Sequence, residues 1–438
     1  MVRVRFAPSP TGYLHIGGLR TCLYNWLYAK KNHGTFILRI EDTDQSRSET
    51  GFLKNIQSML EWLGFCPDEG PFYQSERLNI YHKQAENLLK SGFAYEEAQE
   101  GSPGKALRFK LKPEEVVFQD HVYGRIRIDN RNNDDFIILK SDAMPSYNFA
   151  CVVDDALMGI THVIRGDDHI SNTPKQIALY QALGFSVPEY IHVPMILGSD
   201  GKRLSKRHGA TAVSAYKEQG FIAYALLNYL ALLGWSPGDN REVMDLDEMI
   251  ESFSIDRILK KSAVFDPEKL LWMNAQHIRK MTPQKFEETL KEFVPSWMIE
   301  DPSWEALIKL HQNRTKILTD FSQQTAYFFG EAIHYDSEAA QKHLSDPVTS
   351  ERLIQLANTI EKIDPYDVPN LEKSLRDMAD GLGVKAAQLI HPARVALTGA
   401  TASPGIFELM VLLGKKRVCE RLCLAAQWSN DFRQGGVS

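Results

Sequence analysis

The N-terminal segment restricts the fold more than any other part of this 438-residue chain. Residues 2–7 (VRVRFA) alternate in the manner of a strand, and residues 35–41 (TFILRIE) also have strand character. Between them, the turn-rich stretch PSPTGYLHIGG leads into LRTCLYNWLYAKKNHG, whose apolar residues recur at helical spacing as far as Gly34. This order predicts a βαβ unit, and therefore a parallel sheet with a right-handed crossover.

Strand and helix patterns alternate through the first half of the chain, with one interruption. Residues 92–135 are rich in Gly, Pro and charge, and alternation resumes at DDFIILK. From about Ala212 the pattern is mostly helical. We therefore predict an α/β, doubly wound (Rossmann-like) domain with a small insertion, followed by all-helical domains. The predicted boundaries are 1–91 and 136–211 for the two halves of the α/β domain, 92–135 for the insertion, and 212–300 and 301–438 for two helical domains.

Composition narrows the class of protein. The chain is 43% hydrophobic and 24% charged, which is ordinary for a soluble protein, and no apolar run approaches the roughly 20 residues of a membrane span. The five cysteines lack disulfide-framework spacing, and the N-terminus lacks the apolar stretch of a secretory signal. We predict a cytoplasmic protein without membrane association. Cys419 and Cys423, four apart in a predicted helix, are predicted to be core residues.

The net charge of −6 argues against a nucleic-acid partner, but the charge is unevenly distributed. Residues 105–131 carry seven Lys or Arg against four acids, and residues 202–208 (KRLSKRH) form a second basic run. Phosphate is met by such local patches rather than by the overall balance. Taken alone, each patch is better explained as a solvated face.

The stretch PSPTGYLHIGG lies between the first predicted strand and its helix, at the carboxyl edge of the sheet, where α/β proteins bind ligands. Its glycines allow close approach of a phosphate or base, the helix N-terminus favours negative charge, and His15 can donate a hydrogen bond to phosphate. The alternative is a tight turn in which the histidine only caps the helix.

The second stretch is RLSKR, about 190 residues later, after a Gly-Ser-Asp-Gly turn. A basic loop here could reach a triphosphate and stabilise the charge that moves onto the leaving pyrophosphate, with Lys206 as the electrostatic catalyst. An exposed basic loop without function is the alternative.

Together the two stretches resemble the HIGH and KMSKS motifs of class I aminoacyl-tRNA synthetases. From residue 3 to about residue 421 the sequence is similar to the bacterial-type glutamyl-tRNA synthetase family. The segments that carry the similarity are RFAPSPTGYLHIGGLRT, RIEDTD, YNFACVVDD, VIRGDDH, KRLSKR, GFIAYALLNYLALLGW, FDPEKLLWMN and HPARVALTGATASPGIFELMVLLGK.

Glutamate carries one ammonium and two carboxylates, so its pocket needs cationic and anionic partners. Arg5 and Arg165 end predicted strands, Glu41 could pair with the ammonium, and Tyr147 could close the pocket. Alternatively, these strand-end charges pair with one another. The resemblance implies that glutamate is bound by Arg5, Ala7, Ser9, Glu41, Tyr147 and Arg165.

The resemblance also implies ATP, with Mg²⁺, as the second substrate, and catalytic roles for His15 and Lys206. The residues implied in ATP binding are Pro8, His15, Gly17, Gly18, Leu197, Ser205 and Lys206. Three positions depart from the pattern. Gly18 replaces the last histidine of HIGH, Cys151 stands where many relatives carry asparagine, and Arg203 occupies the first lysine position of KMSKS. Some relatives bind zinc in the insertion, but residues 92–135 contain no cysteine and only His121, so we predict no metal site.

The implied activity is ATP-dependent joining of L-glutamate to tRNA(Glu), by a monomer. The insertion would hold the acceptor end, and the chain beyond residue 301 would hold the anticodon. Within the family, an enzyme that charges tRNA(Gln) alone or as well is an alternative. A glutaminyl enzyme fits less well because the C-terminal part looks helical, and a short tRNA-modifying paralogue would lack that part. From another class, a catalytically silent tRNA-binding paralogue is argued against by His15, Glu41, Arg165 and Lys206.

One arginine is predicted to read the anticodon. Glutamate-specific family members use an arginine in the helical anticodon region, and Arg314 in HQNRTKILTDF falls near the matching place. An ordinary exposed helix arginine is the alternative.

Overall fold

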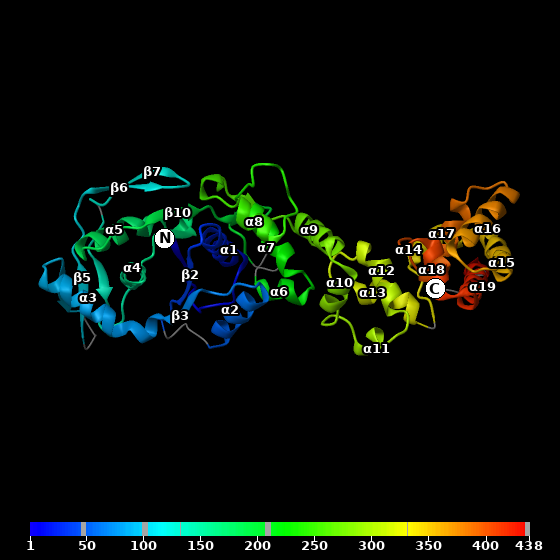
Figure 1. Ribbon diagram of the computed structural model, residues 1–438, viewed down its shortest axis with the longest axis horizontal. Helices are drawn as coiled ribbons and strands as arrows, with labels where there is room; N and C mark the ends of the chain where they lie inside the picture. The colour runs from blue at the N-terminus through cyan, green and yellow to red at the C-terminus, as the bar shows by residue number, and fades with distance from the viewer. Residues whose placement is uncertain (45–49, 99–103, 132, 206–211, 331, 434–438) are drawn as a thin grey trace. The chain divides into compact units, whose positions relative to one another are not determined.

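The computed structural model describes residues 1–44, 50–98, 104–131, 133–205, 212–330 and 332–433. The chain divides into two compact units, Met1–Met273 and Asn274–Ser438, which are described separately (Figure 1).

The first unit is built on parallel strands in two groups. Backbone hydrogen bonds pair β1 with β2, β2 with β3, and β9 with β10, all parallel. The amide of Thr161, just before β9, donates to the carbonyl of Arg3 in β1 at 2.9 Å, which places the two groups side by side. The order is therefore β3-β2-β1-β9-β10, which confirms the doubly wound prediction. These strands are β1 (Arg3–Phe6), β2 (Thr35–Ile40), β3 (Glu69–Tyr73), β9 (His162–Gly166) and β10 (Glu189–Val193).

The helices of this unit follow the predicted alternation. The first, α1, begins directly after His15 and ends with Lys30 and Lys31, whose positive charges suit a helix C-terminus. Strand β2 is buried over almost its whole length, as expected for a parallel strand covered on both faces. The helices are α1 (Ile16–Lys31), α2 (Thr50–Trp62), α3 (Leu78–Lys90), α4 (Tyr147–Leu157), α5 (Thr173–Ala182), α6 (Val213–Glu218), α7 (Ala223–Leu232) and α8 (Leu246–Ser252).

The strands between β3 and β9 form two further structures. A three-stranded antiparallel sheet, β4-β5-β8, packs on α3, α4 and α5. The hairpin of β6 and β7 joins the edge strand β10 and runs parallel to it at β6. The strand predicted at DDFIILK exists, but as β8 it belongs to the antiparallel sheet and not to the parallel alternation. The strands are β4 (Ala94–Ala98), β5 (Lys105–Phe109), β6 (Glu115–Asp120), β7 (Gly124–Asp129) and β8 (Phe136–Leu139).

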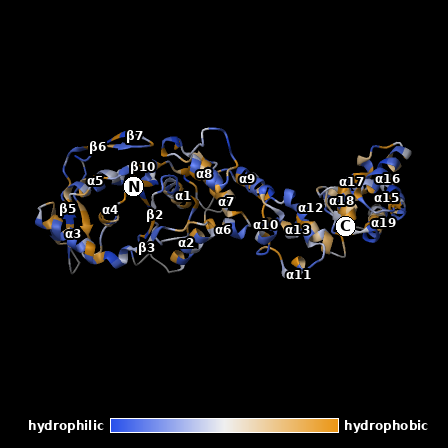
Figure 2. Cartoon of the chain, viewed as in Figure 1, coloured by the Kyte–Doolittle hydropathy of each residue, from blue (hydrophilic) through white to orange (hydrophobic). Residues whose placement is uncertain are grey.

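The short strands β11 (Ile196–Leu197) and β12 (Ala263–Val264) pair in parallel, and α9 (Pro267–Lys280) follows them. In the second unit all the described regular secondary structure is helical. Among the described helices, α15 and α19 share the most extensive interface. Helix α18, which is hydrophobic along most of its length, packs against α16 and α19 (Figure 2). The helices are α10 (Pro283–Leu290), α11 (Ser296–Ile299), α12 (Trp304–His311), α13 (Asp320–Phe329), α14 (Ser337–Leu344), α15 (Pro347–Glu361), α16 (Val368–Gly381), α17 (Ala387–Thr398), α18 (Ile406–Leu413) and α19 (Lys415–Arg433).

The prediction that Cys419 and Cys423 are core residues is wrong. Both lie on α19, but Cys419 is only partly buried and Cys423 is exposed. The spacing of four identifies one helix side without telling which side faces the core. No helix in the described part of the chain has the length and apolarity needed to span a bilayer.

Candidate active site

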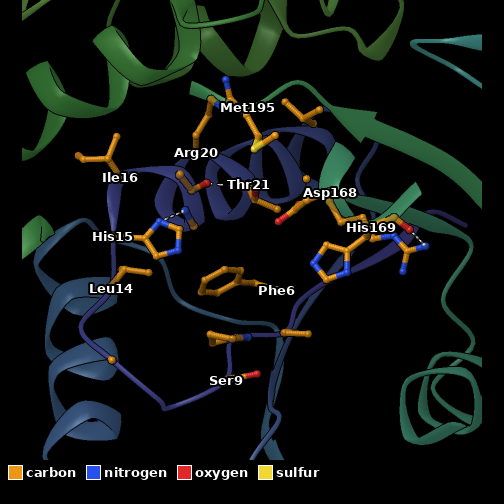
Figure 3. A pocket seen from close by; sticks show the side chains of 18 of the residues that line it. Phe6, Ser9, Leu14, His15, Ile16, Arg20, Thr21, Asp168, His169 and Met195 are labelled. Carbon is orange, nitrogen blue, oxygen red and sulfur yellow. Dashed lines mark hydrogen bonds between the residues drawn. The ribbon is translucent and has the colours of Figure 1, made fainter. Parts of the chain in front are cut away.

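A cavity of about 900 Å³ opens where the parallel strands end (Figure 3). Its walls include the ends of β1, β9 and β10, the residue after β2, and the loop that leads into α1. The strand order reverses between β1 and β9, so the cavity occupies the crevice where doubly wound folds bind ligands.

The structure gathers most of the predicted site residues around this cavity. Leu197 is not among its lining residues, although the neighbouring Ile196 is, and the Leu197 carbonyl accepts a hydrogen bond from the Phe265 amide. Lys206 lies outside the described residues. The predicted residues that line the cavity are Arg5, Ala7, Pro8, Ser9, His15, Gly17, Gly18, Glu41, Tyr147, Arg165 and Ser205.

His15 caps α1 and at the same time faces the cavity. The Gly18 amide donates to its Nδ1 at 3.0 Å, so Nδ1 holds no hydrogen and the neutral ring carries its hydrogen on Nε2. Loss of surrounding water lowers the pKa of His15, and the guanidinium of Arg203 lowers it further. A Cβ at Gly17 would lie 3.2 Å from the His15 ring, so a larger residue there would displace the ring by a few tenths of an ångström. The capping role and a phosphate-donor role are therefore compatible.

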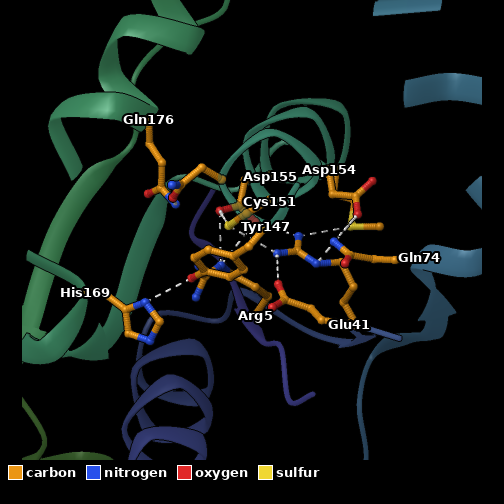
Figure 4. A network of polar contacts seen from close by, with 12 residues as sticks. Arg5, Glu41, Gln74, Tyr147, Cys151, Asp154, Asp155, His169 and Gln176 are labelled. Atoms are coloured by element: carbon orange, nitrogen blue, oxygen red, sulfur yellow. Dashed lines mark hydrogen bonds and ion pairs between the residues drawn. The ribbon is translucent and has the colours of Figure 1, made fainter. Parts of the chain in front are cut away.

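A buried network of charged side chains adjoins the cavity (Figure 4). At its centre Arg39, fully buried on β2, donates to Asp155 at 2.6 Å and to Glu41 at 3.1 Å. Arg5 donates to the same Asp155 carboxylate at 3.1 Å. Asp154 lies 3.8 Å from Arg39. The partners that hold Asp154 are Gln74, Arg77 and Tyr81.

Burial disfavours the charged form of both Glu41 and Asp155 in this network, but the net pKa shifts of the two groups have opposite signs. Burial raises the pKa of Glu41, and the nearby Arg39 and Arg5 only partly oppose that rise. Burial also disfavours the Asp155 carboxylate, but Arg5 and Arg39 outweigh this effect and lower its pKa to about 2. Asp155 therefore stays charged. The charged form of Glu41 would be stabilised by an additional cation such as an ammonium group.

Cys151 belongs to the same network. Its thiol lies 3.6 Å from an Asp155 oxygen and 3.7 Å from the Arg39 guanidinium. Burial raises the pKa of Cys151 to about 12, so the side chain is a neutral thiol. At this position it packs and donates weakly rather than acting as a nucleophile.

Comparison with known proteins decides the family. The model of class I tRNA synthetases for E and Q, catalytic domain, matches residues 1–102 and 96–272, and an anticodon binding domain matches residues 282–426. The chain belongs to the class I tRNA synthetases. Proteins named glutamate–tRNA ligase are similar to this synthetase over nearly its whole length. One from Geobacter sulfurreducens is 44% identical and covers 96% of this chain and 97% of its own.

Further relatives agree. A glutamate–tRNA ligase 1 from Syntrophus aciditrophicus is 43% identical, with 96% of each chain covered. A crystal structure of a glutamate tRNA ligase from Elizabethkingia meningosepticum, in complex with its amino acid, superimposes on this synthetase with a TM-score of 0.88. That chain is 31% identical and covers 97% of this one and 99% of its own.

Sequence reasoning missed three polar residues near the cavity of this synthetase: His169, His192 and Thr173. Each of them contacts a predicted site residue. Tyr147 is placed by a contact of 3.1 Å between its hydroxyl and the Nδ1 of His169. Arg165 contacts His192 and Thr173, from β10 and α5. The sequence signal for His192 is a polar residue inside the otherwise apolar end of β10, whereas His169, in the polar turn DDHISN, gives no such signal.

The basic run 202–208 is described as far as Ser205, and Arg203 in this part contacts a residue of the cavity wall. Arg203 lies 3.6 Å from Asp168, which follows β9 and also lines the cavity. Within the described ranges, no three His, Cys, Asp or Glu side chains are grouped so that they could hold a metal ion.

Arg314 lies in the second unit of the synthetase, in a short 3₁₀ turn after α12, and its side chain is exposed. Burial lowers the pKa of Arg394, and the positive charge of Arg314 lowers it further. Both fall within the match to the anticodon binding domain.

Proposed function

We propose that this synthetase is a glutamate–tRNA ligase, which activates L-glutamate with MgATP and transfers it to the 3′ end of tRNA(Glu). The proposal is carried by one observation: a single cavity presents the cationic groups of Arg5 and Arg165 together with the carboxyl group of Glu41. Glutamate needs this combination, because two carboxylates require donors and the ammonium requires an acceptor. The names of the relatives agree with this activity.

The reaction proceeds in two steps. The α-carboxylate of glutamate attacks the α-phosphorus of ATP, and pyrophosphate leaves as glutamyl-adenylate forms. A hydroxyl of the terminal tRNA ribose then attacks the activated carbonyl, and AMP leaves. The enzyme supplies no nucleophile, so positioning and charge stabilisation carry the rate.

The ATP half of the cavity would be formed by the loop before α1. There the Nε2–H of His15 can donate to a phosphate oxygen, and Gly17 and Gly18, in the first turn of α1, carry no side chain that would keep a nucleotide from the backbone. We place Lys206 at the departing pyrophosphate, from its position in the KMSKS-like motif. We also assign residues 92–135 to the acceptor end, 212–300 to the stem and 301–438 to the anticodon, and propose a cytoplasmic monomer.

Exchange of labelled pyrophosphate into ATP tests the activation step. We expect the purified full chain to catalyse exchange that depends on glutamate and not on glutamine, measured with and without tRNA(Glu). Aminoacylation of tRNA(Glu) and tRNA(Gln), assayed side by side, tests the second step. A chain that binds tRNA(Glu) but gives no glutamate-dependent exchange under either condition would be the catalytically silent paralogue instead.

Preference for tRNA(Glu) should depend on Arg314. The cognate anticodons of glutamate and glutamine differ in their third base, C against G. C offers two adjacent acceptors on its pairing edge, whereas G offers one acceptor and two donors, so a guanidinium favours C. We expect Arg314→Gln to narrow the preference for tRNA(Glu) over tRNA(Gln) by about 1–3 kcal/mol, the usual worth of one base contact.

The measurement is kcat/KM for each tRNA, with Arg376→Gln as a matched control, because Arg376 is an exposed arginine elsewhere in the same unit. A wild type that charges both tRNAs equally would contradict this assignment and support the non-discriminating alternative. An Arg314→Gln enzyme with an unaltered preference would also contradict it.

A further inference from the structure

We propose that Asp120 and His192 form a hydrogen-bonded relay that orients the guanidinium of Arg165 toward the glutamate carboxylate. Asp120 and His192 are then positioning residues, which act on the substrate through Arg165. The proposal rests on the proposed function, because it assigns the cavity at Arg165 to glutamate.

Three neighbouring strands bring the relay together. Arg165 on β9 lies opposite His192 on β10 in the parallel register, and β6, which ends at Asp120, pairs with the other side of β10. The Nδ1 of His192 lies 2.7 Å from Asp120 Oδ2, and Arg165 Nε donates to His192 Nε2 at 3.2 Å. Asp120 and His192 are fully buried and Arg165 is 5% exposed, so water does not compete for these bonds.

The partners fix the tautomer of His192. A guanidinium has only donors, so the Nε2 that faces Arg165 must be the acceptor, and the hydrogen of the neutral ring must be on Nδ1. Asp120 is arranged to receive it. Its Oδ1 accepts from the amides of Val122 and Tyr123 at 2.9 and 2.8 Å, and its Oδ2 accepts from the His192 amide at 3.1 Å. The carboxylate thus acts as an acceptor at both oxygens.

The relay leaves one part of the guanidinium for a ligand. The Nη2 of Arg165 donates to Thr173 at 2.9 Å, and the Tyr190 ring lies 5.5 Å from the guanidinium carbon. Nε is taken by His192. Nη1 is buried and has no hydrogen-bond partner among the described residues, while Arg165 lines the cavity. A buried donor without a partner is costly, so this nitrogen is the one to expect at a carboxylate oxygen.

The charge state of His192 controls this arrangement. Burial lowers the pKa of His192, and Arg165 lowers it further, while Asp120 opposes the change. As the pH falls through this pKa, Nε2 gains a hydrogen and stops accepting from Arg165. The titratable and charged groups that face the ring are Asp120, Arg165, Asp167, His169 and Tyr190.

Two variants of His192 separate the two ends of the relay. In His192→Asn the amide nitrogen can replace Nδ1 at Asp120, but nothing replaces Nε2. In His192→Gln the longer amide can present its oxygen to Arg165. We expect H192N to raise the KM for glutamate about tenfold or more, the effect of losing a bond to a charged group, with kcat and the KM for ATP much less affected. H192Q should restore most of the loss.

The assay is glutamate-dependent pyrophosphate exchange with tRNA(Glu) present, from about pH 8 to about pH 5, a range that extends below the ordinary histidine pKa of about 6.5 because the pKa of His192 is lowered. In the wild type the KM for glutamate should rise at the acidic end. In H192Q this rise should be smaller than in the wild type, because only the titration of Glu41, whose pKa is raised by burial, remains. His162→Asn is the matched control. His162 is on the same strand as Arg165, contacts Tyr28 and Thr161, and does not line the cavity, so its KM values should not change.

Each outcome is decisive. A folded H192N enzyme with a wild-type KM for glutamate would overturn the relay alone. If H192N does not fold, an H192Q enzyme that keeps the wild-type rise of KM at acidic pH overturns it. A wild type without glutamate-dependent exchange would reject the proposed function, and the relay with it.

Discussion

Replacing Arg39 with methionine is expected to lower the free energy of unfolding by about 3–5 kcal/mol, the usual effect of breaking a buried ion pair. Arg39 is fully buried and binds both Asp155 and Glu41. Without it, these carboxylates remain in the interior with fewer cations near them, and burial of an unpaired charge costs more than the lost pair contributed. The change in the free energy of unfolding is measured by chemical denaturation of the full chain, from the transition in which the first unit unfolds.

The exposed Arg131, paired with Asp129 on the hairpin, gives a matched control. Arg131→Met should leave the unfolding midpoint unchanged, because exposed pairs contribute little. An Arg39→Met protein as stable as the control would show that the network stabilises nothing.

The buried network around Arg39 also makes the free energy of unfolding depend on pH. The pKa of Asp155 in the folded protein is about 2, below the value of about 3.9 for an unfolded aspartate. Stability from this group is therefore complete above about pH 4 and is lost as the pH falls toward about 2. Arg39→Met removes one of the two guanidinium groups that lower this pKa, so acid unfolding should begin at a higher pH than in the wild type.

Replacing Lys206 with alanine is expected to slow adenylate formation several hundredfold while leaving the protein folded. Loss of one charge contact to a transition state typically costs about 3–4 kcal/mol. The prediction comes from the KMSKS-like position of Lys206, which lies outside the described residues. Single-turnover formation of glutamyl-adenylate under saturating ATP and glutamate measures the chemical step.

Lys202→Ala is the control, since Lys202 is an exposed lysine four residues earlier in the same segment. It removes the same charge, so a general loss of positive potential would slow both variants equally. A Lys206→Ala enzyme that keeps more than half the wild-type activation rate would show that the assignment is wrong.

The parallel part of the fold was predictable from the sequence because its strands and helices each have a clear local periodicity of apolar residues. The strands around α1 and the loop with His15 follow from alternation, helical spacing and turn residues within the first 41 positions. The partner of a strand is not a local property. DDFIILK has a strand pattern, but whether it joins a parallel or an antiparallel sheet depends on β5, about 30 residues earlier.

The polar interior was less predictable for the same reason. Arg5 and Glu41 could be proposed from their places at strand ends, but their partners could not. Arg39 meets Asp155 over 116 positions, and His192 meets Asp120 over 72. A charge inside an apolar strand signals that a partner exists, because an unpaired one would be too costly, yet it does not identify the partner.

The position of β1 in the sheet has a consequence for synthesis of the chain. Its neighbour on one side, β2, leaves the ribosome soon after it, but Thr161, which bonds to Arg3 on the other side, comes 158 residues later. At about 5–20 residues per second, this edge of the nascent sheet stays unpaired for roughly 8 to 30 seconds. The antiparallel sheet β4-β5-β8 can close during that interval, since its strands are near each other in sequence. During that interval the open edge of β1 is exposed to pairing with other strands.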